Sequence, residues 1–292
     1  MDLDLRKLRY FVEVAEQLHF GRAAENLHIT QPVLSRQINR LERELGVSLF
    51  HRSSRQVSLT EAGEQLLEEA RSLLAGADAA QRRVLAAGNG PRTLTVGFMA
   101  GLSVNRAINA FSDRYPDINV DIRRIEWYDQ AEVIRDGVVD VAFVRPPIED
   151  QGLWIRTLYA EPRLAVLPAS HRFAGRRSLS IMELADDPVV MHLNASPAWD
   201  AFCNTDPRPD GRHPVPGPAI RTMDEKLEHV AAGRAITFLP ESAAHYYLRR
   251  DVVCVPVTDI PPHPVCLAGP ADRDTDLIEA FAETAVAIRP AA

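Results

Sequence analysis

The sequence has 292 residues, of which 46% are hydrophobic and 25% are charged, a balance typical of globular proteins rather than of disordered or fibrous ones. A chain of this length is expected to form two or three compact units. No apolar run approaches the ~20 residues that a membrane span requires. The N-terminus, MDLDLRKLRY, also lacks the basic-then-apolar order of a secretion signal, so we expect a cytoplasmic protein without a membrane partner.

The net charge of −7 is unevenly distributed along the chain. Residues 1–60 carry nine basic and seven acidic side chains, a net charge of +2, whereas residues 61–292 carry 24 and 33, a net charge of −9. Within residues 31–58 five arginines stand against two glutamates. Because the local field, and not the total charge, attracts the DNA backbone, this segment is a candidate for nucleic-acid binding.

Two helices are expected before residue 30. At residues 5–18 apolar side chains recur at steps of three and four, which predicts an amphipathic helix. A second helix is expected at about 21–27, where the small side chains of Ala23 and Ala24 let another helix cross closely.

A third helix is expected to begin after Thr30, a favourable N-cap residue, with Pro32 in the first turn where proline is tolerated. Its buried face consists of Leu34, Ile38, Leu41 and Leu45. Its outward face carries side chains that can contact base edges and phosphates, namely Gln31, Ser35, Arg36, Asn39 and Arg40. The alternative is an ordinary solvated face of a core helix.

Two short strands are expected at residues 49–50 and 57–59, on either side of the polar segment HRSSRQ. They would form a hairpin, or wing, whose Arg52 and Arg55 can reach backbone phosphates or the minor groove.

The segment from Leu5 to Gly63 resembles the winged helix-turn-helix of LysR-type transcriptional regulators. The resemblance is carried by F-x-x-AA-x-x-L, QP-x-LS-x-QI-x-x-LE-x-x-LG-x-x-LF and LT-x-x-G. It implies that residues 1–60 form a DNA-binding domain for an interrupted palindrome in double-stranded DNA. It also implies that Gln31, Pro32, Ser35 and Arg36 contact the major groove and that Arg52 and Arg55 contact the flanking backbone. The full set of expected DNA-binding residues is Thr30, Gln31, Pro32, Ser35, Arg36, Asn39, Arg40, Arg52 and Arg55.

Residues 61–90 are expected to form a linker helix that starts at the Thr60 cap and ends at the GNGP breaker. Its apolar side chains step alternately by four and three residues, which is the spacing of a helix-pairing seam. The expected seam consists of Leu66, Ala70, Leu73, Ala77, Ala80 and Val84. We favour pairing with a second copy, because a palindrome is read by two copies about one helical turn apart. Docking of this helix on its own domain is the alternative.

Residues 91–292 alternate between strand and helix patterns, which predicts a mostly parallel sheet covered by helices. In the first half, strands are expected at 93–98, 118–125 and 140–144, and helices at about 103–114 and 129–136. In the second half, strands are expected at 164–168, 235–240, 252–257 and 265–269, capping boxes at Ser180–Glu183 and Thr222–Glu225, and a final helix at about 275–288. The proline-rich stretch 207–218 is expected to be a long surface loop.

This region resembles the LysR effector domain, which has two α/β lobes similar to periplasmic solute-binding proteins. The resemblance implies a lobe I of residues 91–162 and 267–292 and a lobe II of residues 163–266, with crossings near 162–165 and 264–267. The expected fold class is therefore α plus α/β: a winged helix-turn-helix, a long linker helix and a two-lobed effector-binding domain. Ligands of such sheets bind beyond the carboxyl ends of the strands, where helix N-termini favour anions. The expected effector-binding residues are Gly101, Leu102, Ser103, Trp127, Tyr128, Arg145, His192, Asn194, Thr222 and Phe238.

Arg145 is the best candidate for holding a ligand carboxylate, with an ion pair between the lobes as the alternative. Ser103 is a candidate for a hydroxyl contact, and Trp127 and Tyr128 for stacking on a ring, unless Trp127 belongs to the core. Relatives that sense aromatic acids often carry a hydroxyl residue where this chain has Gly101, and lack a tryptophan at position 127. A small organic or aromatic acid is the expected effector.

Enzyme and metal motifs are missing from the sequence. There is no GxSxG, P-loop, GxGxxG after a strand or HExxH, and the nine histidines form no pair at metal-ligand spacing, so neither a cofactor nor a metal is expected. The three cysteines are expected to be buried reduced thiols, with a redox sensor as the alternative. A solute carrier would not explain residues 1–60. We interpret the chain as a dimeric or tetrameric transcriptional regulator whose effector changes lobe closure or subunit packing, and thereby the spacing of the DNA-binding domains.

Overall fold

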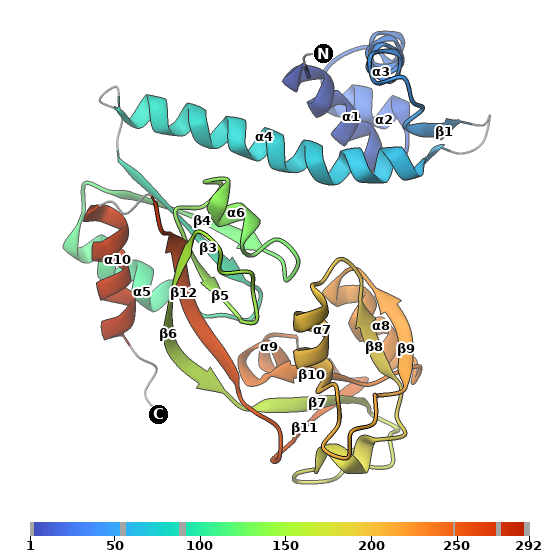
Figure 1. Ribbon diagram of the computed structural model, residues 1–292, viewed down its shortest axis with the longest axis vertical. Helices are drawn as coiled ribbons and strands as arrows, with labels where there is room; N and C mark the ends of the chain where they lie inside the picture. Colours follow the sequence, from blue (N-terminus) through green and yellow to red (C-terminus); the bar gives the residue numbers. More distant parts are fainter. Residues whose placement is uncertain (1–2, 53–56, 88–91, 248, 273–275, 289–292) are drawn as a thin grey trace. The chain divides into compact units, whose positions relative to one another are not determined.

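A computed structural model describes residues 3–52, 57–87, 92–247, 249–272 and 276–288. The described residues form two compact units, one that contains helices α1–α4 and a hairpin, and one that contains every element from β3 onward (Figure 1). None of the helices in the described ranges combines the length and the apolar character that crossing a membrane demands.

The N-terminal unit begins with three helices, α1 (Leu5–Gln17), α2 (Phe20–Asn26) and α3 (Gln31–Leu45). The caps are local: the Asp4 carboxylate accepts from the backbone N–H of Arg6, and α3 ends at Gly46 in the left-handed region with φ +73°. Leu34, Ile38 and Leu41 are fully buried, as the sequence predicted, whereas Leu45 is half-buried. Thr30 does precede the first turn of α3, but its side chain makes no capping hydrogen bond.

The predicted hairpin consists of β1 (Phe50–Arg52) paired antiparallel with β2 (Val57–Leu59), and the long helix α4 (Glu61–Ala87) follows. Thr60 caps α4 by accepting from the backbone N–H of Gly63 at 3.0 Å. A Cβ atom on Gly63 would lie 2.1 Å from the carbonyl oxygen of Leu49, so only glycine fits where the helix meets the hairpin. This close approach gives the physical reason for the glycine in the LT-x-x-G motif.

The C-terminal unit contains a five-stranded sheet with the order β4-β3-β5-β12-β6. The strands are β3 (Thr93–Met99), β4 (Asn119–Ile125), β5 (Val141–Val144), β6 (Leu153–Glu161) and β12 (His263–Pro270). β3 is parallel to β4 and β5, whereas β12 is antiparallel to β5 and β6. The helices of this lobe are α5 (Asn105–Arg114), α6 (Glu132–Arg135) and α10 (Asp276–Ala287).

A second lobe contains the three-stranded sheet β10-β7-β11 and the parallel pair β8-β9. Its strands are β7 (Arg163–Pro168), β8 (Val189–His192), β9 (Pro216–Ile220), β10 (Thr237–Pro240) and β11 (Val252–Pro256). Its helices are the 3₁₀ turn η1 (Ile181–Leu184), α7 (Pro197–Asn204), α8 (Met223–Ala231) and α9 (Glu241–Tyr246). The chain passes between the lobes at Pro162 and at residues 257–262, slightly before the second crossing expected from the sequence.

The expectation of a mostly parallel sheet is wrong. The sheet β10-β7-β11 is antiparallel throughout, because both outer strands run antiparallel to β7. The five-stranded sheet is mixed, because β12 returns antiparallel to β5 and β6. The helix expected at 129–136 is only the single turn α6, and the expected loop 207–218 ends inside β9. The Ser180–Glu183 capping box is confirmed, whereas at Thr222 only half of the box forms, because the Glu225 carboxylate accepts from the backbone N–H of Arg221.

Candidate DNA-binding face and effector site

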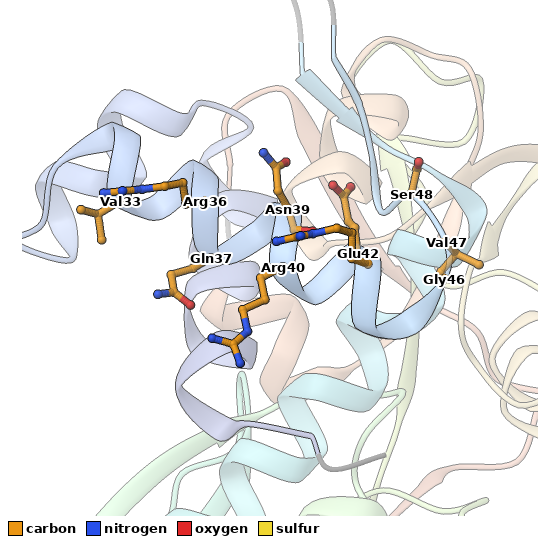
Figure 2. Close-up of a pocket in the computed structure, with 10 residues that line it drawn as sticks. Val33, Arg36, Gln37, Asn39, Arg40, Glu42, Gly46, Val47 and Ser48 are labelled. Carbon is orange, nitrogen blue, oxygen red and sulfur yellow. The ribbon is translucent and has the colours of Figure 1, made fainter.

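The outer face of α3 borders an open groove of about 1040 Å³. Its lining comes entirely from α3 and the segment that follows it, and consists of Val33, Arg36, Gln37, Asn39, Arg40, Glu42, Arg43, Gly46, Val47 and Ser48. Figure 2 shows Asn39 and Glu42 on one side of the helix and Gln37 and Arg40 on the other. Three of the predicted residues therefore line the groove, and sequence reasoning missed Gln37 and Arg43, which share the exposed face at helical spacing.

Other predicted contacts occupy the first turn of α3. Thr30, Gln31 and Pro32 are exposed and Ser35 is half-buried, but none of them lines the groove. The N-terminal end of a recognition helix is where base edges are met, so this location is compatible with the predicted roles.

Of the predicted cations that the structure describes, Arg36 has the fewest contacts within the protein. Its one hydrogen bond within the described residues joins Nε to the carbonyl oxygen of Pro32 at 3.3 Å, one turn earlier on the same helix. Both terminal nitrogens therefore remain available for a bidentate contact with a guanine edge or a phosphate.

Arg40 is held by a network beneath the groove. Its Nε donates to Oε1 of Glu44 at 2.9 Å, and the ammonium of Lys7 donates to Oε1 and Oε2 of the same carboxylate at 2.7 and 2.5 Å. These bonds lower the pKa of Glu44, with Lys7 as the larger cause. Lys7 is 6% exposed, so this network ties α1 to α3.

Arg52, expected to contact phosphates, is engaged within the protein. Its guanidinium donates to the side-chain oxygen of Asn39 at 2.7 Å and to Glu42 at 2.8 Å, and lies 4.9 Å from the centre of the Phe20 ring. Glu42 also accepts from the backbone N–H of Leu49 at 2.8 Å. Arg52 and Asn39 thus brace the hairpin against α3, a role that depends on contacts between distant segments. Arg55 lies outside the described residues.

The expected pairing seam on α4 divides into two parts. Leu66 and Ala70 pack against the core of their own unit, with Ala70 fully buried. Leu73 and Val84 are 44% and 72% exposed. For Leu66 and Ala70 the structure shows the alternative, docking on their own domain. The remaining seam residues Leu73, Ala77, Ala80 and Val84 are outside that buried core, although the contact with α1 extends as far as Asp78, which pairs with Arg9 at 2.8 Å.

The loop after β3 holds three of the residues expected to bind effector. Gly101 has φ +89°, and a Cβ atom there would lie 2.6 Å from the Cα atom of Ala243 in α9 of the second lobe. A hydroxyl residue at this position would collide with the second lobe, which gives a physical reason for the departure from relatives noted above. Leu102 is buried, and the exposed Ser103 donates from Oγ to the side-chain oxygen of Asn105 at 2.8 Å.

Arg145 is buried at the end of β5, with 2% of its surface exposed. Its Nη2 donates to Oε2 of Glu161 at 2.8 Å and to Oγ of Ser242 at 2.9 Å, so it links β6 with α9. Its backbone is held by the side-chain amide of Gln130, whose oxygen accepts from the Arg145 N–H at 2.8 Å. The ion pair with Glu161 thus lies within lobe I, and it is the hydrogen bond to Ser242 that crosses to lobe II, so the inter-lobe ion pair given as the alternative does not form in the described structure. Among the described residues the buried Nη1 has no hydrogen-bond partner.

Trp127 and His192 come together from different lobes. Trp127 is 7% exposed, and its ring centre lies 5.7 Å from that of His192 and 5.3 Å from the ammonium of Lys226. His192 Nδ1 bonds Oδ1 of Asp200 at 2.7 Å, and burial lowers the pKa of His192 to about 4. Sequence reasoning missed Lys226, although it lies between Met223, Leu227 and Val230 on the buried stripe of α8.

A small cleft of about 50 Å³ adjoins Trp127. Its lining is contributed by loops of the first lobe and by one residue of the second, and consists of Trp127, Tyr128, Gln130, Ala131, Glu132, Pro147, Ile148, Glu149 and Ser196. The other predicted residues have local roles: Thr222 caps α8, Asn194 is exposed with φ +62°, and Phe238 is buried near the guanidinium groups of Arg163 and Arg208.

Metal-binding groups and cysteine thiols are the remaining candidates for chemistry in the described residues. Among the described residues no group of three His, Cys, Asp or Glu could hold a metal ion. The three cysteines are free thiols, and burial raises the pKa of Cys203 to about 11, so this thiol stays protonated at neutral pH.

Both units of the chain match models of known protein families. Residues 5–64 match the model of the bacterial regulatory helix-turn-helix of the lysR family, and residues 87–288 match the LysR substrate binding domain. The chain is 32% identical over 255 residues to the transcriptional regulator AlsR of Bacillus subtilis (strain 168), covering 82% of each chain. It is 37% identical over 216 residues to HcaR, the hca operon transcriptional activator of Escherichia coli (strain K12), covering 70% of this chain and 73% of HcaR.

Solved structures agree with this assignment. The crystal structure of full-length CbnR complexed with its target DNA is similar with a TM-score of 0.54 and 25% identity, covering 97% of this chain and 98% of CbnR. An N-terminal helix-turn-helix, a long helix and a two-lobed effector domain follow one another in the order of this family. The chain belongs to the LysR family of transcriptional regulators.

Proposed function

We propose that this regulator binds an interrupted palindrome in double-stranded DNA as a dimer or tetramer, and that a small organic acid bound between its lobes controls its action on promoters. The observation that carries the proposal is the groove along α3, where the two terminal nitrogens of Arg36 have no partner among the described residues. The existence of a solved complex between the similar protein CbnR and its target DNA supports it.

The proposal divides the chain by task. Residues 1–60 bind DNA, residues 61–90 link the units and pair with a second copy, and residues 91–292 bind the effector. Within the last region, lobe I comprises 91–162 and 267–292 and lobe II comprises 163–266. The exposure of Leu73 and Val84 supports pairing through the second half of α4.

We further infer that the protein has no enzymatic activity and acts in the cytoplasm, where its DNA target lies. His192 and Asp200 have the geometry of a base and its orienting carboxylate, yet burial keeps the nearby Cys203 as an unreactive thiol. Among the described residues we find no serine or threonine hydroxyl bonded to His192 that could serve as its nucleophile.

The direct test is DNA binding by full-length protein and its Arg36→Ala variant. With DNA from upstream of its own gene as the probe, Arg36→Ala should lose about 1–3 kcal/mol of binding free energy at the protected site, measured by footprint titration. Arg177→Ala, an exposed arginine of the C-terminal unit, is the matched control and should bind normally. Equal affinities for the wild type and Arg36→Ala would remove Arg36 from the interface, and no protected site would contradict the proposal.

A further inference from the structure

The ammonium of Lys226 is a buried charge without a counter-ion. Lys226 is 4% exposed, and among the described residues it takes part in none of the ion pairs or side-chain hydrogen bonds. The Asp200 carboxylate favours the charged form of Lys226 from a distance, but it is hydrogen-bonded to His192 and forms no ion pair with Lys226 in the described structure. Burial of such a charge destabilises the fold unless a partner neutralises it.

The local environment makes the positive charge still less favourable. Lys226 lies in the first turns of α8, where the backbone N–H groups present positive partial charge. Burial is the main reason that the pKa of Lys226 is lowered to about 8. The attraction of the Trp127 ring, whose centre lies 5.3 Å from Nζ, compensates only part of this cost.

Two more unsatisfied groups belong to the same cluster. Trp127 Nε1 and His192 Nε2 are both buried, and neither has a hydrogen-bond partner in the described part of the chain. The Trp127 N–H can only donate, whereas Nε2 of a neutral His192 accepts, because Nδ1 carries the proton donated to Asp200. One cation, one donor and one acceptor therefore belong to a single buried cluster where lobe I, through Trp127, meets lobe II, through His192 and Lys226.

We propose that Lys226 is the residue that selects a carboxylate as the effector, holding its negative charge against Trp127 while His192 accepts a hydrogen bond from the ligand. This inference rests on the proposed function and names the chemical class that the effector site takes. A carboxylate supplies the missing counter-ion and an acceptor for the Trp127 N–H, and an acid that also bears a hydroxyl group supplies the donor for His192. Trp127 also lines the cleft of about 50 Å³, so one of the three residues of the cluster borders an opening between the lobes.

Binding at this point would couple the ligand to the lobes. The ligand would contact Trp127 from lobe I and Lys226 from lobe II, so it would favour the arrangement in which both residues reach it. A ligand shifts such an equilibrium only by its difference in affinity between the two arrangements, and a charge contact available in one arrangement provides that difference.

The test compares small acids with their uncharged amides on the full-length protein. Thermal unfolding is measured at constant ionic strength with acetate and acetamide, lactate and lactamide, benzoate and benzamide, and salicylate and salicylamide. At least one acid should raise the melting temperature of the wild type more than its amide does. In Lys226→Met, which keeps the apolar stem, the affinity for that acid should fall roughly tenfold or more. If no acid differs from its amide, or if the difference persists in Lys226→Met, the inference is overturned.

A second measurement does not depend on a variant that folds. Lys7 and Lys226 are the only lysines of the sequence, so ¹⁵N-lysine labelling gives two ammonium signals to follow by NMR. The stabilising acid should raise the pKa of Lys226 and leave the signal of Lys7, which is already paired with Glu44, unchanged. An unchanged Lys226 signal would contradict the inference.

The outcomes also separate this inference from the proposed function. If a neutral compound stabilises the wild type and Lys226→Met equally while the protein protects its DNA site, the proposed role of Lys226 is wrong. The proposal that the protein is an effector-controlled regulator is then unaffected. If the protein protects no DNA site, the proposed function falls whatever the acids do.

Discussion

The two lysines of this protein show how differently its two units treat a buried charge. Lys7 in the N-terminal unit is 6% exposed and Lys226 in the C-terminal unit is 4% exposed. Lys7 donates to both oxygens of Glu44, whereas Lys226 forms no ion pair within the described residues. The two lysines are thus almost equally buried, but only the charge of Lys7 is neutralised by an ion pair in the described structure.

The difference extends beyond the lysines. The buried side-chain nitrogen and oxygen atoms without a partner that we find in the described ranges all lie between Trp127 and Tyr247, in the C-terminal unit. Buried polar groups are normally satisfied, so these atoms are where an ordered water or a bound molecule would supply the missing hydrogen bonds. In the N-terminal unit, by contrast, the positive charge of Arg36 lies on an exposed face of α3.

The largest effect is expected where the C-terminal unit does contain a complete buried pair. Arg145→Met removes the cation that Glu161 needs, and both side chains are almost fully buried, so unfolding free energy should fall by about 3–5 kcal/mol. Chemical denaturation measures this loss, and the double variant Arg145→Met/Glu161→Gln should recover much of it. A single variant as stable as the wild type would show that the pair contributes nothing to the fold.

An intermediate effect is expected from acidification of the cluster around His192. The pKa of His192 is lowered to about 4 in the folded protein, below its ordinary value of 6.5, so between these values the unfolded state binds more protons. Stability should therefore be lost as the pH falls from 6.5, by about 2 kcal/mol near pH 5. Neighbouring Asp200 and Lys226 share this field, so the measurement compares the wild type with His192→Gln, whose pH dependence should be shallower. Parallel curves would contradict the lowered pKa.

The smallest expected change in stability comes from replacing each of the two lysines, and it tests the difference between the two units directly. Lys7→Met should destabilise the protein by about 1 kcal/mol, because Glu44 keeps Arg40 as a partner and is one-third exposed. Lys226→Met, which removes an unpaired charge, should raise the melting temperature of the ligand-free protein. Calorimetric scans of both variants, prepared in the same buffer, give the two signs. The same sign for both would remove the contrast between the units.

Much of the N-terminal unit could be predicted because its signals are local. Apolar residues at steps of three and four predict the helices, and Pro32 and Gly46 mark the two ends of α3. The hairpin is predicted by two apolar strands on either side of a polar segment. What failed there depends on distant contacts: Arg52 is captured by α3, and Ala70 docks on its own unit. No spacing along the chain shows either partner.

The C-terminal unit was harder to predict for the same reason. β12 pairs antiparallel with β5 and β6, more than a hundred residues earlier in the chain, and this pairing makes the sheet mixed. The expected effector-binding residues lie in loops that follow strands. This rule predicts Trp127, Arg145 and His192 but identifies none of the residues that they contact. Lys226 could have been noticed as a lone charge on an apolar stripe, but only the fold places it over Trp127.

The sequence by itself determined the family, the order of the domains and the face of α3, because these follow from periodicity and from motifs whose residues act within one helix or turn. Only the tertiary structure decided which charges are paired. Lys7 and Lys226 are both lysines on the buried face of a helix, and they differ because folding places Glu44 within hydrogen-bond distance of Lys7, whereas no described carboxylate forms an ion pair with Lys226. Pairing is a property of segments that meet in space, and the free energy of a buried charge is set by that meeting.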